Sequence, residues 1–507
     1  MLRRTSFETA CERPKEVTDE MKCTQSITYS AAGKPVRVCR EIPVTKEADE
    51  ARHLESGVIN LYPEIGYQTI EGFGGAMTET AASLFMGLPE EERKAALSAY
   101  FGPEGSHAHF IRTSIDSCDY SLEEYQAVAD PVADPDFATF TLDRDRKYIL
   151  PMIKEAMAMS SEPLEVLLSP WSPPYQWKTP PARPKNDASV YGGFFGMKEP
   201  DYDTPQRNNG GSLKPEFYGA WARYLAMYVR GYLDEGIPVT MMTMQNESIA
   251  ATSWDSCVWT AAEQKLFLKD HLYPAFEEAG LADKVGIFIW DHNKERVFEW
   301  AREMIDETTA PMIAGIAFHW YSGDHFEAVA LTAEKFPGKT LMLSECCGLH
   351  KPGTAGFDLP FLPRTKTPET AETEDAVQYG HDIIGNLNAG MQRWIDWNFC
   401  VDTGGGPRHV PGGFTAPMIV DGAKWRVNLS YDYICHFSRF ILPGAKRIAF
   451  SRCDDVTEMT AARNPDGSVV LVALNRTAKD AFYAVRIEGS VIRFDAPAGT
   501  IGTLVIE

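Results

Sequence analysis

The chain has 507 residues, with 71 acidic and 49 basic side chains and a formal net charge of −22. This excess of negative charge argues against a nucleic-acid partner, because proteins that bind nucleic acids neutralise phosphates with Lys and Arg. The composition, 44% hydrophobic and 24% charged, is that of a globular protein. No run approaches the roughly 18 consecutive apolar residues of a spanning helix, so we expect no stable membrane insertion.

The N-terminal region is polar over residues 1–20 and contains no apolar segment of the kind found in secretory signal peptides. We interpret it as a polar tail and expect a cytoplasmic protein. The ten cysteines agree with this location. They include no Cys-x-x-Cys pair, and the neighbouring Cys346 and Cys347 cannot form an unstrained disulfide with each other, so we expect reduced thiols.

Residues 21–68 contain short runs of alternating apolar and polar residues, at 26–30 and 36–40. Residues 426–507 show the same alternation, for example at 469–475 and 484–487. This pattern is typical of antiparallel strands with one exposed face. The two ends of the chain are therefore predicted to share one antiparallel β domain.

Between residues 69 and 425 the pattern changes to short apolar runs separated by longer segments with helical periodicity, which is typical of a parallel sheet with βα repeats. Eight strands in a segment of this length predict an α/β fold, a (β/α)₈ TIM barrel that forms the catalytic domain, with the antiparallel β domain appended. The eight apolar runs lie at 70–77, 110–117, 164–169, 239–244, 285–290, 315–320, 340–344 and 394–399.

Two connections of the predicted barrel carry further information. The segment 214–232 is predicted to be a helix because its large apolar residues fall on one face. The segment 179–212 is rich in Pro, Gly, Asn and Asp and is too long for an ordinary βα loop. We expect it to help wall the mouth of the barrel.

Two glutamates stand where a barrel of this type places its functional groups, at the C-terminal ends of strands. Glu247 closes the fourth apolar run and Glu345 closes the seventh. Strands four and seven face each other across a closed barrel, so both carboxylates can converge on one pocket. Paired carboxylates indicate glycoside hydrolysis, in which one protonates the leaving oxygen and the other attacks the anomeric carbon. The alternative is that each is a solvated charge on the rim.

Seven motifs in chain order resemble glycoside hydrolase family 30, the glucosylceramidase-like retaining β-glycosidases. The likeness runs from about residue 60 to the C-terminus. It implies a (β/α)₈ barrel fused to a β-sandwich built from both chain ends, with no metal and no organic cofactor. The motifs are Gly-Phe-Gly-Gly-Ala-Met-Thr-Glu at 72–79, Ser-Cys-Asp-Tyr-Ser at 117–121, Ser-Pro-Trp-Ser-Pro-Pro at 169–174, Gln-Asn-Glu at 245–247, Phe-His-Trp-Tyr at 318–321, Ser-Glu at 344–345 and Asp-Trp-Asn at 396–398.

The resemblance also implies roles for the residues around the two glutamates. The glutamate of the Asn-Glu pair, Glu247, corresponds to the acid/base, and Glu345 corresponds to the nucleophile. Asn246 can donate a hydrogen bond to the sugar 2-OH, a contact that strengthens in the oxocarbenium-like transition state. The alternative for Asn246 is that it caps a turn at the strand end.

Five further residues complete the predicted substrate site. The resemblance places Asp119 and Trp171 on the sugar hydroxyls and Trp397 near the glycone. A tryptophan offers a flat apolar face and an N–H donor to a sugar, although simple core packing is the alternative for both. His319 and Tyr321 end the sixth strand two residues apart and therefore point to the same side. Tyr321 could orient the nucleophile, and His319 could do the same, line the pocket or be a satisfied core histidine.

These observations predict a retaining exo-β-glycosidase whose partner is a β-linked glycoside, most simply a β-glucoside such as glucosylceramide. The same chemistry on β-xylosides or β-fucosides is the first alternative. A carbohydrate-binding barrel without turnover is the second, and the intact Glu247 and Glu345 argue against it. The residues at 175–179 and the long segment after them depart from the family pattern, which leaves the aglycone open. The oligomeric state stays unknown at this stage.

Overall fold

The eight predicted strands form one closed parallel barrel, which confirms the predicted fold class. The computed structural model describes residues 21–31, 34–45, 57–179, 181, 210–252, 254–354, 367–410 and 412–507. Pairing of the eighth barrel strand with the first closes the ring. In chain order the barrel strands are β5 (Gly72–Ala76), β6 (Phe110–Ile115), β7 (Glu165–Pro170), β10 (Val239–Thr243), β11 (Gly286–Asn293), β12 (Gly315–His319), β13 (Thr340–Glu345) and β14 (Arg393–Asp396).

The interior of the barrel is a packed apolar layer. On β5, Gly74 faces β6 so closely that a Cβ there would lie 2.2 Å from the carbonyl oxygen of Phe110, so only glycine fits. The other seven strands each contribute one buried side chain to the layer: Phe110, Leu167, Met241, Phe288, Ala317, Met342 and Ile395. Because this layer fills the barrel, the polar groups beyond it are confined to the mouth at the C-terminal strand ends.

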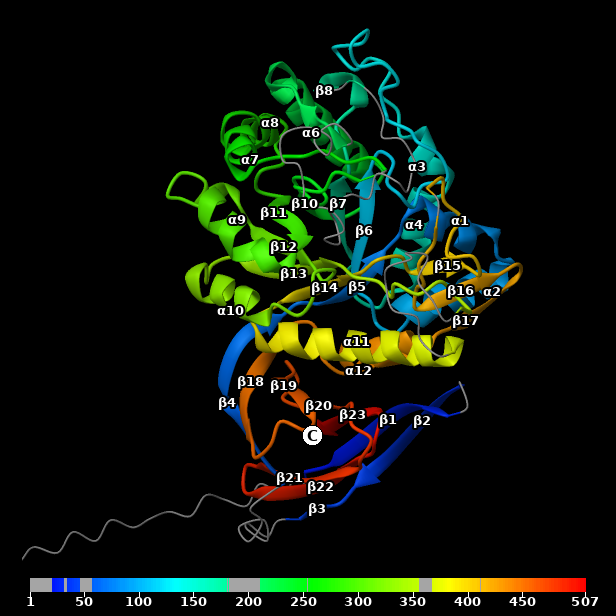
Figure 1. Ribbon diagram of the computed structural model, residues 1–507, viewed down its shortest axis with the longest axis vertical. Helices are drawn as coiled ribbons and strands as arrows, with labels where there is room; N and C mark the ends of the chain where they lie inside the picture. The colour runs from blue at the N-terminus through cyan, green and yellow to red at the C-terminus, as the bar shows by residue number, and fades with distance from the viewer. Residues whose placement is uncertain are drawn as a thin grey trace, which may run out of the picture.

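The helices follow the barrel strands and cover the outside of the ring (Figure 1). The helix predicted at 214–232 is present as a 3-10 turn at Pro215–Phe217 followed by α6, and its buried face includes Trp221, Tyr224 and Tyr228. The helices are α1 (Glu79–Gly87), α2 (Glu90–Phe101), α3 (Asp143–Lys147), α4 (Ile149–Met159), α6 (Tyr218–Asp234), α7 (Ala261–Phe267), α8 (Tyr273–Glu278), α9 (Val297–Met304), α10 (Phe326–Lys335), α11 (Pro368–Asn388) and α12 (Leu429–Ser438).

The two ends of the chain build one β domain, as predicted. β1 pairs antiparallel with β2 from its own end and with β23 from the other end, and β4 pairs with both β18 and β21. Buried side chains such as Leu61, Leu471 and Ile492 form its core. The strands are β1 (Cys23–Ala31), β2 (Lys34–Ile42), β3 (Val44–Thr45), β4 (Val58–Ile70), β18 (Ala445–Arg452), β19 (Glu458–Arg463), β20 (Val469–Asn475), β21 (Ala481–Ile487), β22 (Ser490–Ala496) and β23 (Thr500–Ile506).

Helices α11 and α12 lie between the barrel and the β domain (Figure 1). On α12, the ring of His436 makes hydrogen bonds of 2.8 Å with the hydroxyls of both Thr28 on β1 and Thr503 on β23. Burial lowers the pKa of His436 to about 3, so the ring is neutral and uses one nitrogen as donor and the other as acceptor. The two chain ends are therefore held to the same helix.

Smaller sheets flank the barrel mouth. The three-stranded sheet of β15 (Cys400–Asp402), β16 (Met418–Asp421) and β17 (Lys424–Val427) follows the last barrel strand. The two-stranded sheet of β8 (Lys178–Thr179) and β9 (Ser212–Leu213) joins the two ends of the segment predicted to wall the mouth. The rest of that segment, apart from residues 181, 210 and 211, and the predicted polar tail lie outside the described residues.

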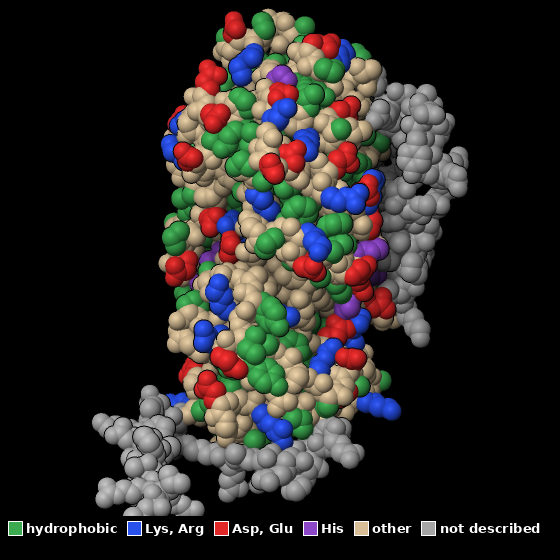
Figure 2. Space-filling model, turned by 90° about the vertical axis from the view of Figure 1, so that its left-hand side faces the viewer, with side chains coloured by type: hydrophobic (Ala, Val, Ile, Leu, Met, Phe, Trp, Pro, Cys, Tyr) green, Lys and Arg blue, Asp and Glu red, His purple; other side chains and the backbone are tan. Residues whose placement is uncertain are grey.

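On the face shown in Figure 2, Lys and Arg side chains are scattered among Asp and Glu, so positive and negative charges do not form separate patches. That face therefore offers no extended basic patch to a polyanion. Among the described residues, no helix combines the length and the apolar composition that crossing a bilayer requires.

Candidate active site

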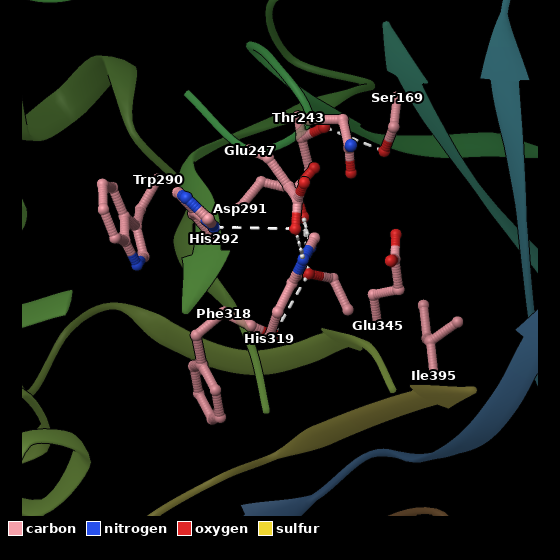
Figure 3. A network of polar contacts seen from close by, with 12 residues as sticks. Ser169, Thr243, Glu247, Trp290, Asp291, His292, Phe318, His319, Glu345 and Ile395 are labelled. Atoms are coloured by element: carbon pink, nitrogen blue, oxygen red, sulfur yellow. Dashed lines mark hydrogen bonds and ion pairs between the residues drawn. The ribbon is translucent and has the colours of Figure 1, made fainter. Parts of the chain in front are cut away.

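Glu247 and Glu345 lie at the same mouth of the barrel (Figure 3). Glu345 is the last residue of β13, and Glu247 follows the end of β10. Glu247 has a φ of 51°, a left-handed conformation that a non-glycine residue adopts at a cost, and its N–H donates to the carbonyl of Asp291 at 2.7 Å. The two glutamates are only 6% and 7% exposed. They are therefore buried groups and not solvated rim charges.

The carboxylate of Glu345 accepts two hydrogen bonds. Arg112 on β6 donates to Oε2 at 2.5 Å, and the hydroxyl of Tyr321 donates to Oε1 at 3.0 Å. Arg112 is fully buried, and its Nη2 also donates to Oδ1 of Asn246 at 2.7 Å and to Oδ2 of Asp291 at 3.0 Å. One guanidinium thus fixes the orientation of three of the polar side chains at the mouth.

Asp291 lies behind the two glutamates and is an anion. Burial alone would raise its pKa, but the charge of Arg112 and hydrogen bonds from His319 and Ser344 hold the pKa well below its usual range. The hydroxyl of Ser344 donates to Oδ1 of Asp291 at 2.5 Å, and Nε2 of His319 lies 3.0 Å from the same oxygen. Asp291 therefore fixes which nitrogen of His319 points toward the site.

Two histidines contact the other glutamate. Nδ1 of His319 lies 3.5 Å and Nδ1 of His292 lies 3.7 Å from Oε1 of Glu247 (Figure 3). Burial opposes the charge on His319, but Glu345, Asp291 and Glu247 raise its pKa to about 9. Burial lowers the pKa of His292 to about 4, so this ring is neutral. The facing atoms of these three side chains all lie within 4.8 Å of one another, a spacing that could hold a metal ion.

The two predicted sugar-binding tryptophans stack on each other. Trp171 follows β7 and Trp397 follows β14, with ring centroids 5.2 Å apart and ring planes inclined by 25°. The guanidinium carbon of Arg112 lies 5.0 Å and 5.5 Å from the two ring centroids. Both tryptophans are almost fully buried, together with Tyr120. The structure therefore brings them beside Arg112, which holds Glu345, as part of an aromatic wall.

Asp119 is buried and paired with Arg408. Nη1 of Arg408 lies 3.4 Å from Oδ2 of Asp119, and the guanidinium also stacks over the ring of Tyr120 at 4.7 Å. Burial raises the pKa of Asp119 to about 7, even though Arg408 favours the charged form. The raised pKa allows Asp119 to carry a proton, so that it can donate as well as accept a hydrogen bond.

The structure brings all eight predicted site residues to one mouth and adds four that the sequence analysis missed: Arg112, Asp291, His292 and Arg408. Arg112 had a visible signal, because it is a charged residue inside an apolar strand. Asp291 and His292 directly follow the fifth apolar run, at a position that favours function in a barrel. Arg408 lies in a loop far along the chain, and we find no sequence signal for its pairing with Asp119.

A (β/α)₈ barrel with two buried glutamates at the ends of strands across its mouth, beside an aromatic wall, defines the class of glycoside hydrolases. Family models place the chain within that class. The glycosyl hydrolase family 30 TIM-barrel domain matches residues 70–441, and the family 30 beta sandwich domain matches residues 444–504. The chain therefore belongs to glycosyl hydrolase family 30.

Individual relatives agree with this family. The lysosomal acid glucosylceramidase of Mus musculus is 30% identical, over 87% of this chain and 82% of its own length. The endo-1,6-beta-D-glucanase of Neurospora crassa is 22% identical, over 85% and 86%. Among solved structures, SrfJ from Salmonella typhimurium is 30% identical with a TM-score of 0.82, over 95% of this chain and 99% of that one. The protein is thus a family 30 glycoside hydrolase related to glucosylceramidases and β-1,6-glucanases.

Proposed function

We propose that this protein is a retaining exo-β-glucosidase in which Glu345 is the nucleophile and Glu247 is the acid/base. The observation that carries the assignment is the difference between the surroundings of the two carboxylates. Arg112 and Tyr321 donate to Glu345, which suits a group that must attack as an anion. Among the described residues, the ionisable side chains that contact the carboxylate of Glu247 are the imidazoles of His292 and His319, which suits a group that must both give and take a proton.

The proposed reaction has two displacements. In the first, an oxygen of Glu345 forms a bond to the anomeric carbon while the bond to the leaving oxygen breaks, and Glu247 gives that oxygen its proton. In the second, Glu247 takes a proton from water, the water oxygen bonds to the anomeric carbon, and Glu345 leaves. Two inversions give net retention of the β configuration, and neither step requires a metal or an organic cofactor.

The remaining residues are proposed to bind the sugar. Arg112 holds Oδ1 of Asn246, which leaves the side-chain NH₂ of Asn246 to donate to the 2-OH. Asp119, Trp171 and Trp397 are proposed to contact the glycone, as the family resemblance implies. The buried pair of Asp119 and Arg408 supports exo action, because it offers polar contacts to the hydroxyls of a terminal sugar.

The glycone and aglycone are proposed from the relatives. The mouse relative is a glucosylceramidase by name, which supports a β-glucoside with a lipid-like aglycone. The fungal relative favours a second candidate, hydrolysis of β-1,6-linked glucan. β-Xylosides and β-fucosides remain alternatives within the same mechanism, and a barrel that binds carbohydrate without turnover is the alternative outside it.

The test is a panel of substrates given to the purified full-length protein. We expect an aryl β-glucoside and glucosylceramide to be hydrolysed faster than the matched aryl β-xyloside and β-fucoside, with monosaccharide as the first product. Release of oligosaccharides from a β-1,6-glucan would contradict exo action and would show that the protein cleaves inside the glucan chain. Proton NMR of the first-formed sugar is expected to show the β-anomer, and an α-anomer would overturn the retaining mechanism.

We also propose a cytoplasmic location, supported by the thiols. All nine cysteines in the described part of the chain are free, and seven of them are buried. A reducing compartment preserves such thiols. Cell fractionation with an antibody to the protein tests this proposal, and recovery in a secreted or vesicular fraction would contradict it.

A further inference from the structure

We propose that Glu247, His292 and His319 form a binding site for one transition-metal ion of the Zn²⁺ type, and that an ion bound there blocks hydrolysis. Binding of the ion depends only on the geometry of the three side chains. The block rests on the proposed function, because it follows from the ion occupying the carboxylate that must transfer the proton.

The three side chains have the spacing of a zinc site. Nδ1 of His319 and Nδ1 of His292 lie 3.5 Å and 3.7 Å from Oε1 of Glu247, and all three atoms fall within 4.8 Å of one another. Two ligands about 2.1 Å from a tetrahedral zinc ion stand roughly 3.4 Å apart. A rotation of the rings would therefore bring all three atoms to bonding distance of one ion.

The two facing nitrogens approach only the carboxylate of Glu247 among the described residues, at distances too long for a good hydrogen bond. Among the described residues, Nδ1 of His292 and Nδ1 of His319 are buried without a hydrogen-bond partner. Buried polar atoms of native proteins usually have a partner, and an ion between these three atoms would satisfy both nitrogens. Binding of the ion would release the proton that His319 carries. Figure 3 shows both rings directed at Glu247.

The other ring nitrogen of His319 has the hydrogen-bond partner that is typical of a metal-binding histidine. Nε2 of His319 lies 3.0 Å from Oδ1 of Asp291, which in turn accepts from the hydroxyl of Ser344. A histidine that ligates zinc through one nitrogen commonly donates its other N–H to a carboxylate, which fixes the ring orientation. The negative charge of Asp291 also helps to balance a divalent ion in a site where all three ligands are buried.

The ligand types determine which ions should bind. Two imidazoles and one carboxylate favour Zn²⁺, Cu²⁺ or Ni²⁺, whereas Mg²⁺ and Ca²⁺ prefer sites made of oxygen ligands. A set of two histidines and one glutamate is known from catalytic zinc sites. In this protein an ion bound to this set would occupy Glu247, the proposed acid/base. The ion would therefore inhibit hydrolysis.

Direct binding is the first test. Isothermal titration of ZnCl₂ into the metal-free full-length protein is expected to show one site per chain that MgCl₂ does not fill. His292→Phe, which keeps a ring, is expected to weaken binding at least tenfold, and Glu247→Gln is expected to weaken it as well. His271→Phe serves as the matched control, because His271 also packs against aromatic rings but lies away from the site. Zinc affinity that is unchanged in both site variants would overturn the proposal.

A second measurement uses the wild-type protein and does not depend on the folding of a variant. Bound Co²⁺ in a four-coordinate site of nitrogen and oxygen ligands gives intense visible absorption, and we expect this spectrum to appear at one equivalent. Displacement of the spectrum by ZnCl₂ would show that both ions use one site. A weak spectrum of the hydrated, six-coordinate ion at all ratios would overturn the proposal.

Measurements of the hydrolysis rate test the proposed metal site and the proposed function independently. Zinc at saturating concentration is expected to inhibit turnover of an aryl β-glucoside at least tenfold, and a chelator is expected to restore it. In His292→Phe, inhibition is measured against that variant's own metal-free rate and should require at least tenfold more zinc. Zinc that binds through His292 without slowing turnover would overturn the acid/base role of Glu247 and leave the site standing. Turnover by a protein that binds no zinc would overturn the site and leave the function standing.

Discussion

The guanidinium of Arg112 on β6 donates to the carboxylate of Glu345 on β13 at 2.5 Å, although β14 and β5 stand between these strands in the ring. The same guanidinium reaches Asn246 beside the other glutamate. A single buried cation therefore links the proposed nucleophile to the side chain that precedes the proposed acid/base. Arg112 therefore fixes Glu345 and Asn246 relative to each other.

Replacing Arg112 by Lys is expected to lower kcat by about 100-fold or more, which corresponds to about 2.7 kcal/mol. Lysine keeps the charge but has no planar fork, so it cannot donate to Glu345, Asn246 and Asp291 at once. Steady-state kinetics on an aryl β-glucoside measures the loss. The melting temperature of the variant is the control for folding, and a folded variant within threefold of wild type would show that the guanidinium geometry is not needed.

The substitution Glu345→Gln is expected to remove turnover by about three orders of magnitude or more, because an amide cannot form the glycosyl-enzyme bond. The side-chain amide keeps the size of the carboxylate. Its oxygen can still accept from Arg112, and its NH₂ can donate to the hydroxyl oxygen of Tyr321, so the fold should persist. Near-ultraviolet circular dichroism checks the fold. Retention of more than about a tenth of the wild-type rate would move the nucleophile to another residue.

The substitution Glu247→Ala is expected to slow substrates with poor leaving groups far more than activated ones such as dinitrophenyl glycosides, since a good leaving group needs little protonation. Added azide should restore turnover of the activated substrate, because this anion attacks the intermediate without a general base. The product is then a β-glycosyl azide, which NMR identifies. Equal losses on both substrates, without rescue by azide, would assign the acid/base role elsewhere.

His381 on α11 is expected to make stability depend on pH. Its Nδ1 lies 2.6 Å from Glu458 on β19 and its Nε2 lies 3.0 Å from Asp324, and these carboxylates raise the pKa of His381. A histidine whose pKa is raised by folding stabilises the protein fully below its unfolded pKa of about 6.5, and the contribution disappears as the pH rises through the folded value.

The melting temperatures of wild type and His381→Gln should therefore differ most near pH 5.5 and converge toward pH 9. The largest difference in the free energy of unfolding should be about 1 kcal/mol. Glu458→Gln should reduce the same difference in a double-mutant comparison, because it removes the partner. A difference that is constant across this range would mean that His381 contributes only by packing.

Much of the architecture follows from local patterns in the sequence. The apolar run that became β10 and the run that became β13 could be recognised because a buried parallel strand is a short apolar segment, whatever its neighbours are. Glu247 and Glu345 could be singled out because each closes such a run. The alternating segment that became β1 likewise indicated an antiparallel strand. The expected exposed face is wrong for β20, because all seven of its residues are buried and helix α11 packs against it.

The contacts that tune the site were decided only by the tertiary structure. Arg112 is visible in the sequence as a charge in an apolar strand, but its partners come from four different strands and loops, and no local pattern specifies them. The pairing of Asp119 with Arg408 joins positions 289 residues apart. Hydrogen bonds and charge pairs between such distant residues depend on how the ring of strands closes.

The sequence by itself thus determined the fold class, the family and the two glutamates, because hydrophobic periodicity and short motifs are local properties of the chain. Only the tertiary structure decided that Arg112 holds Glu345, while His292 and His319 face Glu247. The physical reason is that burial and charge act through space. A carboxylate acquires its chemical role from the groups that surround it after folding, and these groups come from different barrel strands.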